Sequence, residues 1–312
     1  MIIVGSGLCG TLIANKLKIA GRRCTVLEKS KNHGRMATRY IDEKTTVDIG
    51  AQFFTIRQPK FKTLVNEWID DGIVQEWCTG FPPKNDKYPR YIVRQGMRHL
   101  VSVLAKECDV QFDQCVESIT ETELDFIVKT KTNEYRSNTI ILTTPIPQAI
   151  PFVQDILPSQ DLKLLQNIKY YPCLTLLFES KEQISFCGAY QFKGNVVDFL
   201  CNNKVKGISK SNIITLHCAP NFSEDHYNLP LEEIVKFVQQ ELDTFTTIKI
   251  QDATLKRWKY AQPKVPFDAL SLQVNKSTNK KIIFAGDQFG KSKIEGTCLS
   301  ALHVVESLSS SQ

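Results

Sequence analysis

The sequence has little that would indicate a metal site, a disulfide scaffold or a membrane protein. Its ten cysteines contain no Cys-x-x-Cys pair and its five histidines show no ligand spacing, so we expect no bound metal. Most cysteines lie in hydrophobic segments, which predicts buried free thiols in a reducing compartment. Apolar runs stay below the roughly 18 residues of a membrane span, and glycines interrupt the first one, which argues against a signal peptide. We expect a cytoplasmic protein that does not associate with a membrane.

Charge of one sign is not concentrated anywhere in the chain either. The formal net charge is +6 over 312 residues, and lysine and arginine are scattered without an arginine-rich arm. This distribution predicts that nucleic acid is not a partner, whereas a mild positive field suits a small anionic ligand such as a dinucleotide. The length allows one or two domains, and we expect a monomer or a homodimer.

What is present is a glycine-rich start, MIIVGSGLCG, that follows a hydrophobic strand at residues 2–4 and opens a helix ending near residue 21. In a dinucleotide-binding turn, Gly5 makes the tight bend, Gly7 lets the backbone approach a pyrophosphate, and Gly10 lets helix and strand pack closely. Leu8 and Cys9 then lie in the first helical turn, whose free N–H groups face the phosphates. A second strand at 23–29 completes a βαβ-type unit.

Glu28, followed by Lys29, lies at the end of that second strand. A carboxylate there accepts hydrogen bonds from a ribose diol and disfavours a 2′-phosphate, so NAD and FAD both remain open. The next stretch favours FAD: Gly34, Arg35 and Met36 form a glycine–arginine turn that suits dinucleotide phosphates. It leads into a Gly-Ala-Gln-Phe stretch, whose members are Gly50, Ala51, Gln52 and Phe53.

The other end of the chain supplies a matching half-site. A hydrophobic strand within 280–290 ends at Gly286 and Asp287, whose carboxylate can accept from ribityl hydroxyls. Glu295 and Gly296 open a final helix at 295–308, whose N-terminus can point at the flavin pyrimidine carbonyls. Cofactor contacts from both ends of the chain suit a long molecule, so we predict non-covalent FAD. Cys298, one turn into this helix, is expected to pack inward.

Between the two ends the pattern predicts a β-rich insertion. Strands are expected at 139–150, 173–179, 196–202 and 212–219, and amphipathic helices at 61–72, 97–108 and 230–245. The sequence therefore predicts an α/β protein with a Rossmann-type nucleotide domain and a second, mixed-sheet domain.

Seven segments together resemble one family. They are GSGLCG, GRMATR, DIGAQFFT, TTPIPQ, DFLCNNKVKG, KRWKYAQP and AGDQFGKSKIEGTCLSAL, in this order over nearly the whole chain. The chain resembles renalase-like proteins, a branch of the FAD-dependent amine-oxidase superfamily. One departure is His33, which stands where this family usually has a glycine.

The resemblance implies the p-hydroxybenzoate hydroxylase topology. It implies a discontinuous FAD-binding domain of residues 1–57, 93–147 and 276–312, and a substrate domain of residues 58–92 and 148–275. The implied activity is oxidation of the 2- and 6-dihydro isomers of NAD(P)H to NAD(P)⁺. O₂ accepts the electrons and yields H₂O₂, so the partners are a small-molecule dinucleotide and O₂.

Hydride transfer from a dihydropyridine leaves an aromatic cation, so no catalytic base is required and the flavin carries the chemistry. Substrate-side candidates come from the insertion and its borders: Phe54, Tyr171, Asn203, His217 and Trp258. Two alternatives stay open, namely an FAD-dependent oxidase of a small amine and a non-catalytic flavin-binding module. The amine-oxidase alternative is disfavoured, because the sequence of the insertion shows no identifiable acidic or metal constellation that would bind a cationic amine.

Overall fold

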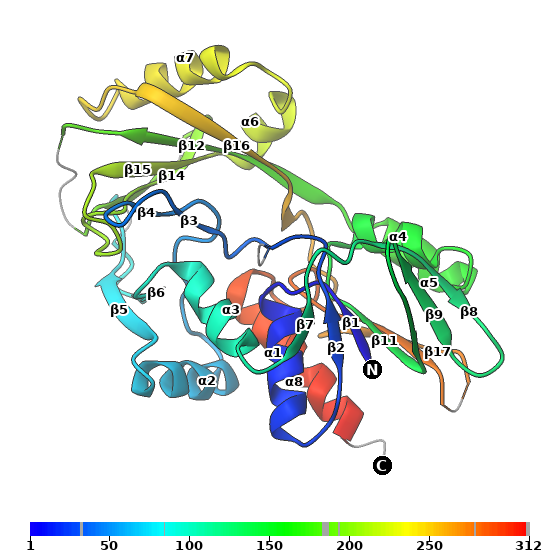
Figure 1. The fold of residues 1–312 in the computed structure, drawn as a ribbon. Coiled ribbons are helices and arrows are strands. Elements are labelled where there is room, and N and C mark those ends of the chain that lie inside the picture. The colour runs from blue at the N-terminus through cyan, green and yellow to red at the C-terminus, as the bar shows by residue number, and fades with distance from the viewer. Residues whose placement is uncertain (32–33, 84, 183–186, 193, 278, 310–312) are drawn as a thin grey trace.

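The fold is built around a six-stranded sheet in the order β17-β18-β11-β1-β2-β7 (Figure 1). This computed structural model describes residues 1–31, 34–83, 85–182, 187–192, 194–277 and 279–309. The strands are β1 (Ile2–Val4), β2 (Thr25–Leu27), β7 (Asp109–Gln111), β11 (Thr139–Leu142), β17 (Leu272–Asn275) and β18 (Lys281–Phe284). Neighbours are parallel except β17, which is antiparallel to β18. Three separate stretches of chain therefore build one sheet.

Both faces of this sheet are covered (Figure 1). Four helices pack on one face: α1 (Leu8–Ile19), α2 (Pro59–Asp70), α3 (Met97–Ala105) and α8 (Lys293–Ser309). The other face carries a three-stranded sheet and two helices: β8 (Val116–Glu121), β9 (Phe126–Thr130), β10 (Glu134–Ser137), α4 (Ile146–Val153) and α5 (Ser159–Gln166). Because the β1, β2 and β11 segments are buried on both sides, they read as continuous apolar runs.

A second sheet has the order β13-β14-β15-β12-β16. Its strands are β12 (Tyr170–Glu179), β13 (Ala189–Gln191), β14 (Val197–Asn202), β15 (Ile213–Cys218) and β16 (Gln251–Pro263). The helices α6 (Pro220–Asp225) and α7 (Leu231–Leu242) cover its outer face. Its inner face turns toward the hairpin of β3 (Thr38–Tyr40) and β4 (Thr46–Asp48), and a further pair is β5 (Val74–Thr79) and β6 (Pro89–Val93) (Figure 1).

The predicted fold class is confirmed, as are the first βαβ unit, the β-rich insertion and the long helices. The buried strand expected within 139–150, stopped by Pro145 and Pro147, is confirmed as β11, which ends at Leu142, but the helix α4 that begins at Ile146 was not predicted. A proline in the first helical turn lacks only an N–H that the helix does not use, so Pro147 is compatible with the start of the helix. The antiparallel β8–β10 sheet was not predicted. The domain boundaries given above remain a prediction.

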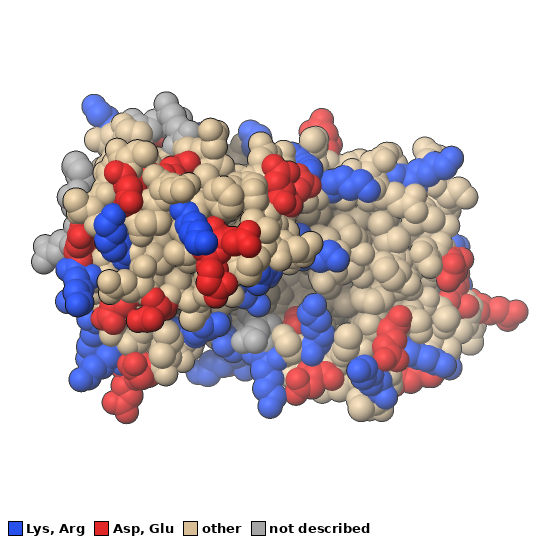
Figure 2. All heavy atoms as spheres, turned by 90° about the horizontal axis from the view of Figure 1, so that it is seen from above, with Lys and Arg blue, Asp and Glu red and all other residues tan. Residues whose placement is uncertain are grey.

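The cysteines are less buried than expected. All ten are free, but only Cys9, Cys201, Cys218 and Cys298 are buried, and the other six are partly exposed. Within the described ranges, no helix is both long and apolar enough to cross a bilayer. Seen from above, acidic and basic side chains are interspersed over a surface that is hollowed toward its middle (Figure 2).

Candidate functional site

The glycine-rich loop lies between β1 and α1, at the carboxyl edge of the parallel sheet. Gly5 has a φ of +102°, which favours glycine, and a Cβ on Gly10 would lie 2.1 Å from the Gly5 carbonyl oxygen. A Cβ on Gly7, by contrast, would meet nothing within 4 Å. Gly10 therefore closes the turn, while Gly7 leaves open space in front of the first turn of α1, where Leu8 and Cys9 lie buried.

Glu28 is buried at the end of β2, beside the same loop. Its carboxylate accepts hydrogen bonds from the Ser6 N–H at 2.9 Å and from the Ser30 N–H at 3.1 Å. These bonds orient both carboxylate oxygens at the point where a ribose diol is predicted to bind. Lys29 follows with its side chain exposed.

The glycine–arginine turn approaches the loop closely. A Cβ on Gly34, which has a φ of +64°, would lie 3.6 Å from the Gly7 Cα. Arg35 makes a bidentate ion pair with Asp287, with N–O distances of 2.5 and 2.6 Å. The turn thus joins the N-terminal loop to the β18 end, 252 residues further along the chain. Met36 packs in the core below, and His33 lies outside the described residues.

The Gly-Ala-Gln-Phe stretch is anchored to that turn. A Cβ on Gly50 would lie 2.0 Å from the Arg35 carbonyl oxygen, and the Ala51 N–H donates to the same oxygen at 2.9 Å. Gln52 donates through Nε2 to the Asp48 and Gly50 carbonyls, whereas its Oε1 is buried without a partner. A buried acceptor in this state suits a donor from a bound ligand.

The C-terminal half-site folds against the same edge. Gly286 has a φ of +136°, and its N–H donates to Ser300 Oγ at 3.0 Å, which holds the β18 end on α8. Glu295 Oε1 accepts from the N–H groups of Arg57 and Gln58, so this side chain fixes the start of α2. Gly296 lies in the first turn of α8, as predicted, and the Cys298 side chain is fully buried, which confirms its inward packing.

These segments fit a bound dinucleotide. Gly10 and Gly50 keep backbone segments closer than a side chain would allow, Gly5 and Gly34 have positive φ angles that favour glycine, Gly7 leaves open space, and Gln52 retains an unsatisfied acceptor. Glu28 would hold a ribose, Arg35 phosphate and Asp287 ribityl hydroxyls. These individual roles remain predictions.

On the substrate side, the structure gathers only part of the predicted set. Tyr171 and His217 lie on the second sheet, and His217 stands opposite Thr175 and Phe199 in the neighbouring strands. Phe54 is elsewhere: it is 4% exposed and its ring packs against Phe61 in the core of the nucleotide half. The substrate-side prediction for Phe54 is therefore wrong, and its neighbour Phe53 contacts Phe199 instead, with ring centroids 5.5 Å apart.

Asn203 and Trp258 have structural partners. Asn203 is fully buried, accepts from the Asp48 N–H, and donates to the Thr215 hydroxyl and the Ile213 carbonyl. Trp258 Nε1 donates to the Ile49 carbonyl at 3.2 Å. Both side chains hold the second sheet to β4 and the residue after it, and a substrate-side role for either remains a prediction.

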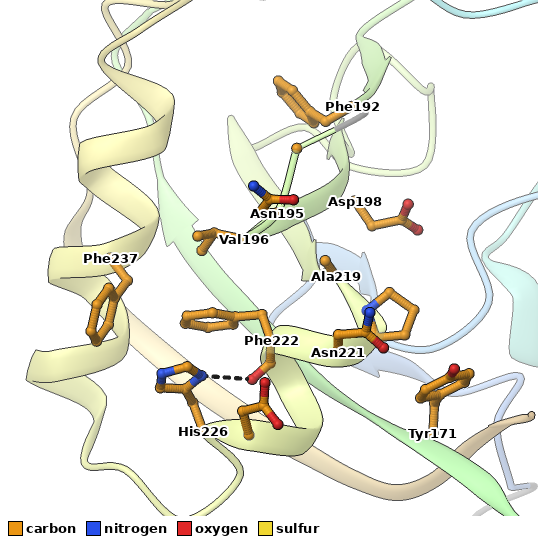
Figure 3. A pocket seen from close by; sticks show the side chains of 13 residues that line it. Tyr171, Phe192, Asn195, Val196, Asp198, Ala219, Asn221, Phe222, His226 and Phe237 are labelled. Carbon is orange, nitrogen blue, oxygen red and sulfur yellow. Dashed lines mark hydrogen bonds between the residues drawn. The ribbon is translucent and has the colours of Figure 1, made fainter.

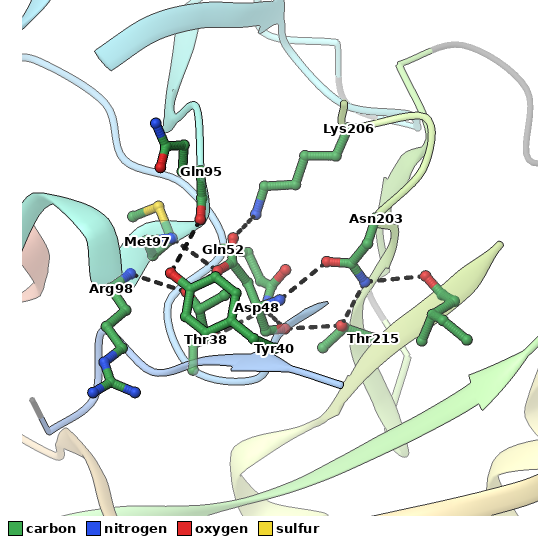
Figure 4. A network of polar contacts seen from close by, with 12 residues as sticks. Thr38, Tyr40, Asp48, Gln52, Gln95, Met97, Arg98, Asn203, Lys206 and Thr215 are labelled. Carbon is green, nitrogen blue, oxygen red and sulfur yellow. Dashed lines mark hydrogen bonds and ion pairs between the residues drawn. The ribbon is translucent and has the colours of Figure 1, made fainter. Parts of the chain in front are cut away.

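The centre of this contact is a buried ion pair that the sequence did not indicate (Figure 4). Lys206 Nζ lies 2.6 Å from Asp48 Oδ2, and neither side chain has exposed surface. Asp48 Oδ1 accepts from the Thr38 hydroxyl at 2.6 Å and from the Met97 N–H at 2.8 Å. One carboxylate therefore joins β3, the start of α3 and the loop after β14.

A cavity of about 690 Å³ opens beside Tyr171 (Figure 3). Phe222 and Phe237 line one end, and the carboxylates of Asp198 and Asp225 also line it. Burial raises the pKa of Asp198 above its usual value, and Lys293 at the start of α8 opposes this rise. The sequence did not mark these two carboxylates, because Asp198 lies in β14 and Asp225 ends α6, and only the fold brings both to one cavity.

His217 offers a polar atom without a partner on the inner face of the second sheet. Its Nε2 is buried without a hydrogen bond. Burial, helped by the charge of Lys206, lowers the pKa of His217 to about 4, so the imidazole is neutral at pH 7.

The depressed pKa of His217 predicts a pH dependence of stability. Between about pH 6.5 and pH 4 the unfolded chain binds a proton at this histidine that the folded chain does not bind. Stability is therefore lost as the pH falls through this window. Thermal unfolding from pH 7 to pH 4 should show a smaller loss for His217→Gln than for the wild type. The same replacement at His303 of α8 is the control, and equal changes in both variants would contradict this origin.

A glycine loop, a buried carboxylate and an arginine turn at one edge of a parallel sheet define a dinucleotide-binding oxidoreductase. The comparisons give the family. Residues 3–68 match the NAD(P)-binding Rossmann-like domain, and residues 68–308 match the flavin containing amine oxidoreductases. The second match covers more than half of the chain, so the protein belongs to the flavin-containing amine oxidoreductase family. It is an FAD-dependent oxidoreductase.

Solved structures share the fold at low identity. Cyclohexylamine oxidase from Brevibacterium oxydans IH-35A is 12% identical with a TM-score of 0.74, over 99% of both chains. A fatty acid isomerase from P. acnes is 11% identical with a TM-score of 0.74, over 98% of this chain and 97% of that one. A putrescine oxidase solved with putrescine is 12% identical with a TM-score of 0.72, over 99% and 98%. At this identity the likeness shows the fold alone.

Proposed function

We propose that the protein oxidises the 2- and 6-dihydro isomers of NAD(P)H to NAD(P)⁺, the activity that its renalase-like motifs imply. When bound, FAD supplies the hydride acceptor, and O₂ takes the electrons to give H₂O₂. The protein must then position the pyridine ring, bind its carboxamide and keep water away.

The neutral, unpartnered His217 carries this proposal. A buried nitrogen of a neutral imidazole can form a hydrogen bond with the carboxamide of a dihydropyridine. It cannot repel the pyridinium cation that hydride loss produces, as an imidazolium would. Its position between Thr175 and Phe199 gives the carboxamide a polar neighbour and an aromatic one.

The other side chains on this face also suit a reaction without proton removal. Burial raises the pKa of Cys173 and of Cys201 to about 12 each, so both thiols stay protonated at pH 7. Thr175 and Phe199 are uncharged. A dihydropyridine needs no base, and the side chains of Thr175, Phe199, Cys173 and Cys201 beside His217 are neutral at pH 7.

One observation favours a second candidate, the oxidation of a small amine. Asp198 and Asp225 line the cavity beside Tyr171, and a carboxylate there could bind an ammonium group. Burial weakens this interpretation, because it raises the pKa of Asp198 and so disfavours the charged form that would bind a cation.

Anaerobic stopped-flow reduction of the FAD-loaded protein tests these alternatives. We expect rapid loss of the visible flavin absorbance with the 2- or 6-dihydro isomers and peroxide on admission of air. Ordinary 4-dihydro NADH should react slowly, because a ring held for transfer from C2 or C6 places C4 away from the acceptor. Cyclohexylamine and putrescine should not reduce the flavin at a useful rate. Rapid reduction by an amine alone would establish the second candidate, and no reduction by either class would indicate a flavin-binding module.

Matched variants connect the result to the site. His217→Phe should slow reduction by the dihydro isomers about tenfold or more, through the loss of one hydrogen bond of about 1.5 kcal/mol. Asp198→Asn should leave that rate within a few-fold. If Asp198→Asn slowed reduction as strongly as His217→Phe, the carboxamide role of His217 would be wrong.

A further inference from the structure

Two cysteines of the second domain lie together although 109 positions separate them. Cys78 is the last residue but one of the β5 strand, just after an irregularity in its pairing with β6 between Glu76 and Cys78. Cys187 precedes β13, and the Trp77 Nε1 donates to its carbonyl oxygen at 3.0 Å. The two thiols share a hydrogen bond and pack in one cluster with Phe81. Both are partly exposed, so a small oxidant can reach them.

We propose that Cys78 and Cys187 form a peroxide-sensitive thiol pair that closes to a disulfide. The pair packs against Phe199 and Cys201, which border the proposed hydride-transfer site, and its oxidant is hydrogen peroxide. The proposal does not require the dihydropyridine reaction, although an oxidase of that kind would produce the oxidant beside it.

The electrostatics assign the two roles. The hydrogen bond from Cys78 lowers the pKa of Cys187, which favours the thiolate form of this residue. The same bond, together with burial, raises the pKa of Cys78. Cys187 is thus the nucleophile, and Cys78 keeps its proton while its partner is a thiolate.

The chemistry balances in two steps. The Cys187 thiolate attacks one oxygen of H₂O₂, the O–O bond breaks, and the second oxygen leaves as hydroxide, giving a sulfenic acid at Cys187. The hydrogen bond from the Cys78 thiol to the Cys187 thiolate is then lost. Cys78 can therefore ionise and attack the Cys187 sulfur. The S–S bond forms and water leaves. In total, two thiols supply two electrons to one peroxide, and two waters result.

The disulfide would act on the contact between the domains. It would tie β5 to the chain before β13 and fix Trp77, whose ring centroid lies 5.7 Å from Lys206 Nζ. Lys206 is the cation of the buried pair with Asp48. Because the cross-link would restrain the unfolded chain, oxidation should raise the melting temperature by several degrees.

The test treats the FAD-loaded protein, without substrate, with a small excess of H₂O₂ at pH 7. We expect the thiol count after denaturation to fall from ten to eight and non-reducing peptide mapping to find one Cys78–Cys187 link. Cys78→Ser should give a trappable sulfenic acid at Cys187 and no link, and Cys187→Ser should give neither. Cys108→Ser, at another partly exposed thiol, is the control and should behave like the wild type.

Wild-type protein provides a second measurement if a variant does not fold. Iodoacetamide should alkylate Cys187 at least tenfold faster than Cys108 at pH 7, with a rate that rises through pH 7. Alkylation of Cys187 no faster than that of Cys108, or loss of two thiols that leaves Cys78 and Cys187 unlinked, would overturn the proposal. Because no nicotinamide substrate is added, these outcomes are independent of the proposed substrate.

Discussion

Lys206→Met is expected to lower the free energy of unfolding by about 3–5 kcal/mol, because it leaves the buried Asp48 carboxylate without its cation. The Lys206–Asp48 pair has no exposed side-chain surface and a separation of 2.6 Å. Asp48 cannot simply turn to solvent, since Oδ1 is already held by the Thr38 hydroxyl and the Met97 N–H. Chemical denaturation monitored by tryptophan fluorescence would measure the loss.

Two further variants separate the buried charge from a general packing defect. Lys249 and Asp243 form an ion pair of similar length, 2.7 Å, with both side chains well exposed. Lys249→Met should therefore lower stability by less than about 1 kcal/mol. Asp48→Asn combined with Lys206→Met should recover much of the loss, because no charge then remains buried. Equal losses for Lys206→Met and Lys249→Met would show that burial does not strengthen the Lys206 effect.

This ion pair also shows where sequence interpretation ends. The glycine turn and Glu28 belong to one βαβ unit, so local spacing was enough to place them at one sheet edge. Asp48 and Lys206 are 158 residues apart, and no local pattern marks either as a partner. Only the antiparallel pairing of β14 with β15 brings Lys206 to the Asp48 side of the sheet.

The substrate-side prediction for Phe54 shows the same limit of local sequence patterns. Alternation along a strand decides which of two neighbouring residues faces a site, and a single-residue error reverses the choice. Phe53 and Phe54 are such a pair, and the sequence offered no reason to prefer Phe53. His217 remains a candidate, and its neutrality depends on burial by strands that lie far away in the sequence.

The second large effect is expected at the glycine loop, where two similar substitutions should have different consequences. Gly7→Ala should leave the protein folded, because its Cβ meets nothing within 4 Å and its φ of −67° suits alanine. Gly10→Ala should instead destabilise the protein by about 1–3 kcal/mol or more, because its Cβ would lie 2.1 Å from the Gly5 carbonyl oxygen.

FAD affinity, in contrast to stability, should fall strongly in Gly7→Ala. A methyl group at position 7 would project into the open space that the predicted pyrophosphate occupies and would move phosphate away from the N–H groups of α1. Losing two hydrogen bonds to a charged group, at about 1.5–3 kcal/mol each, predicts a loss of affinity of roughly a hundredfold or more. Flavin fluorescence titration of apoprotein would measure affinity, and thermal unfolding without FAD would measure stability.

If Gly7→Ala bound FAD as tightly as the wild type, the phosphates would have to lie elsewhere. If Gly7→Ala and Gly10→Ala lost stability equally without cofactor, the open space at Gly7 would be needed for folding and not for the ligand.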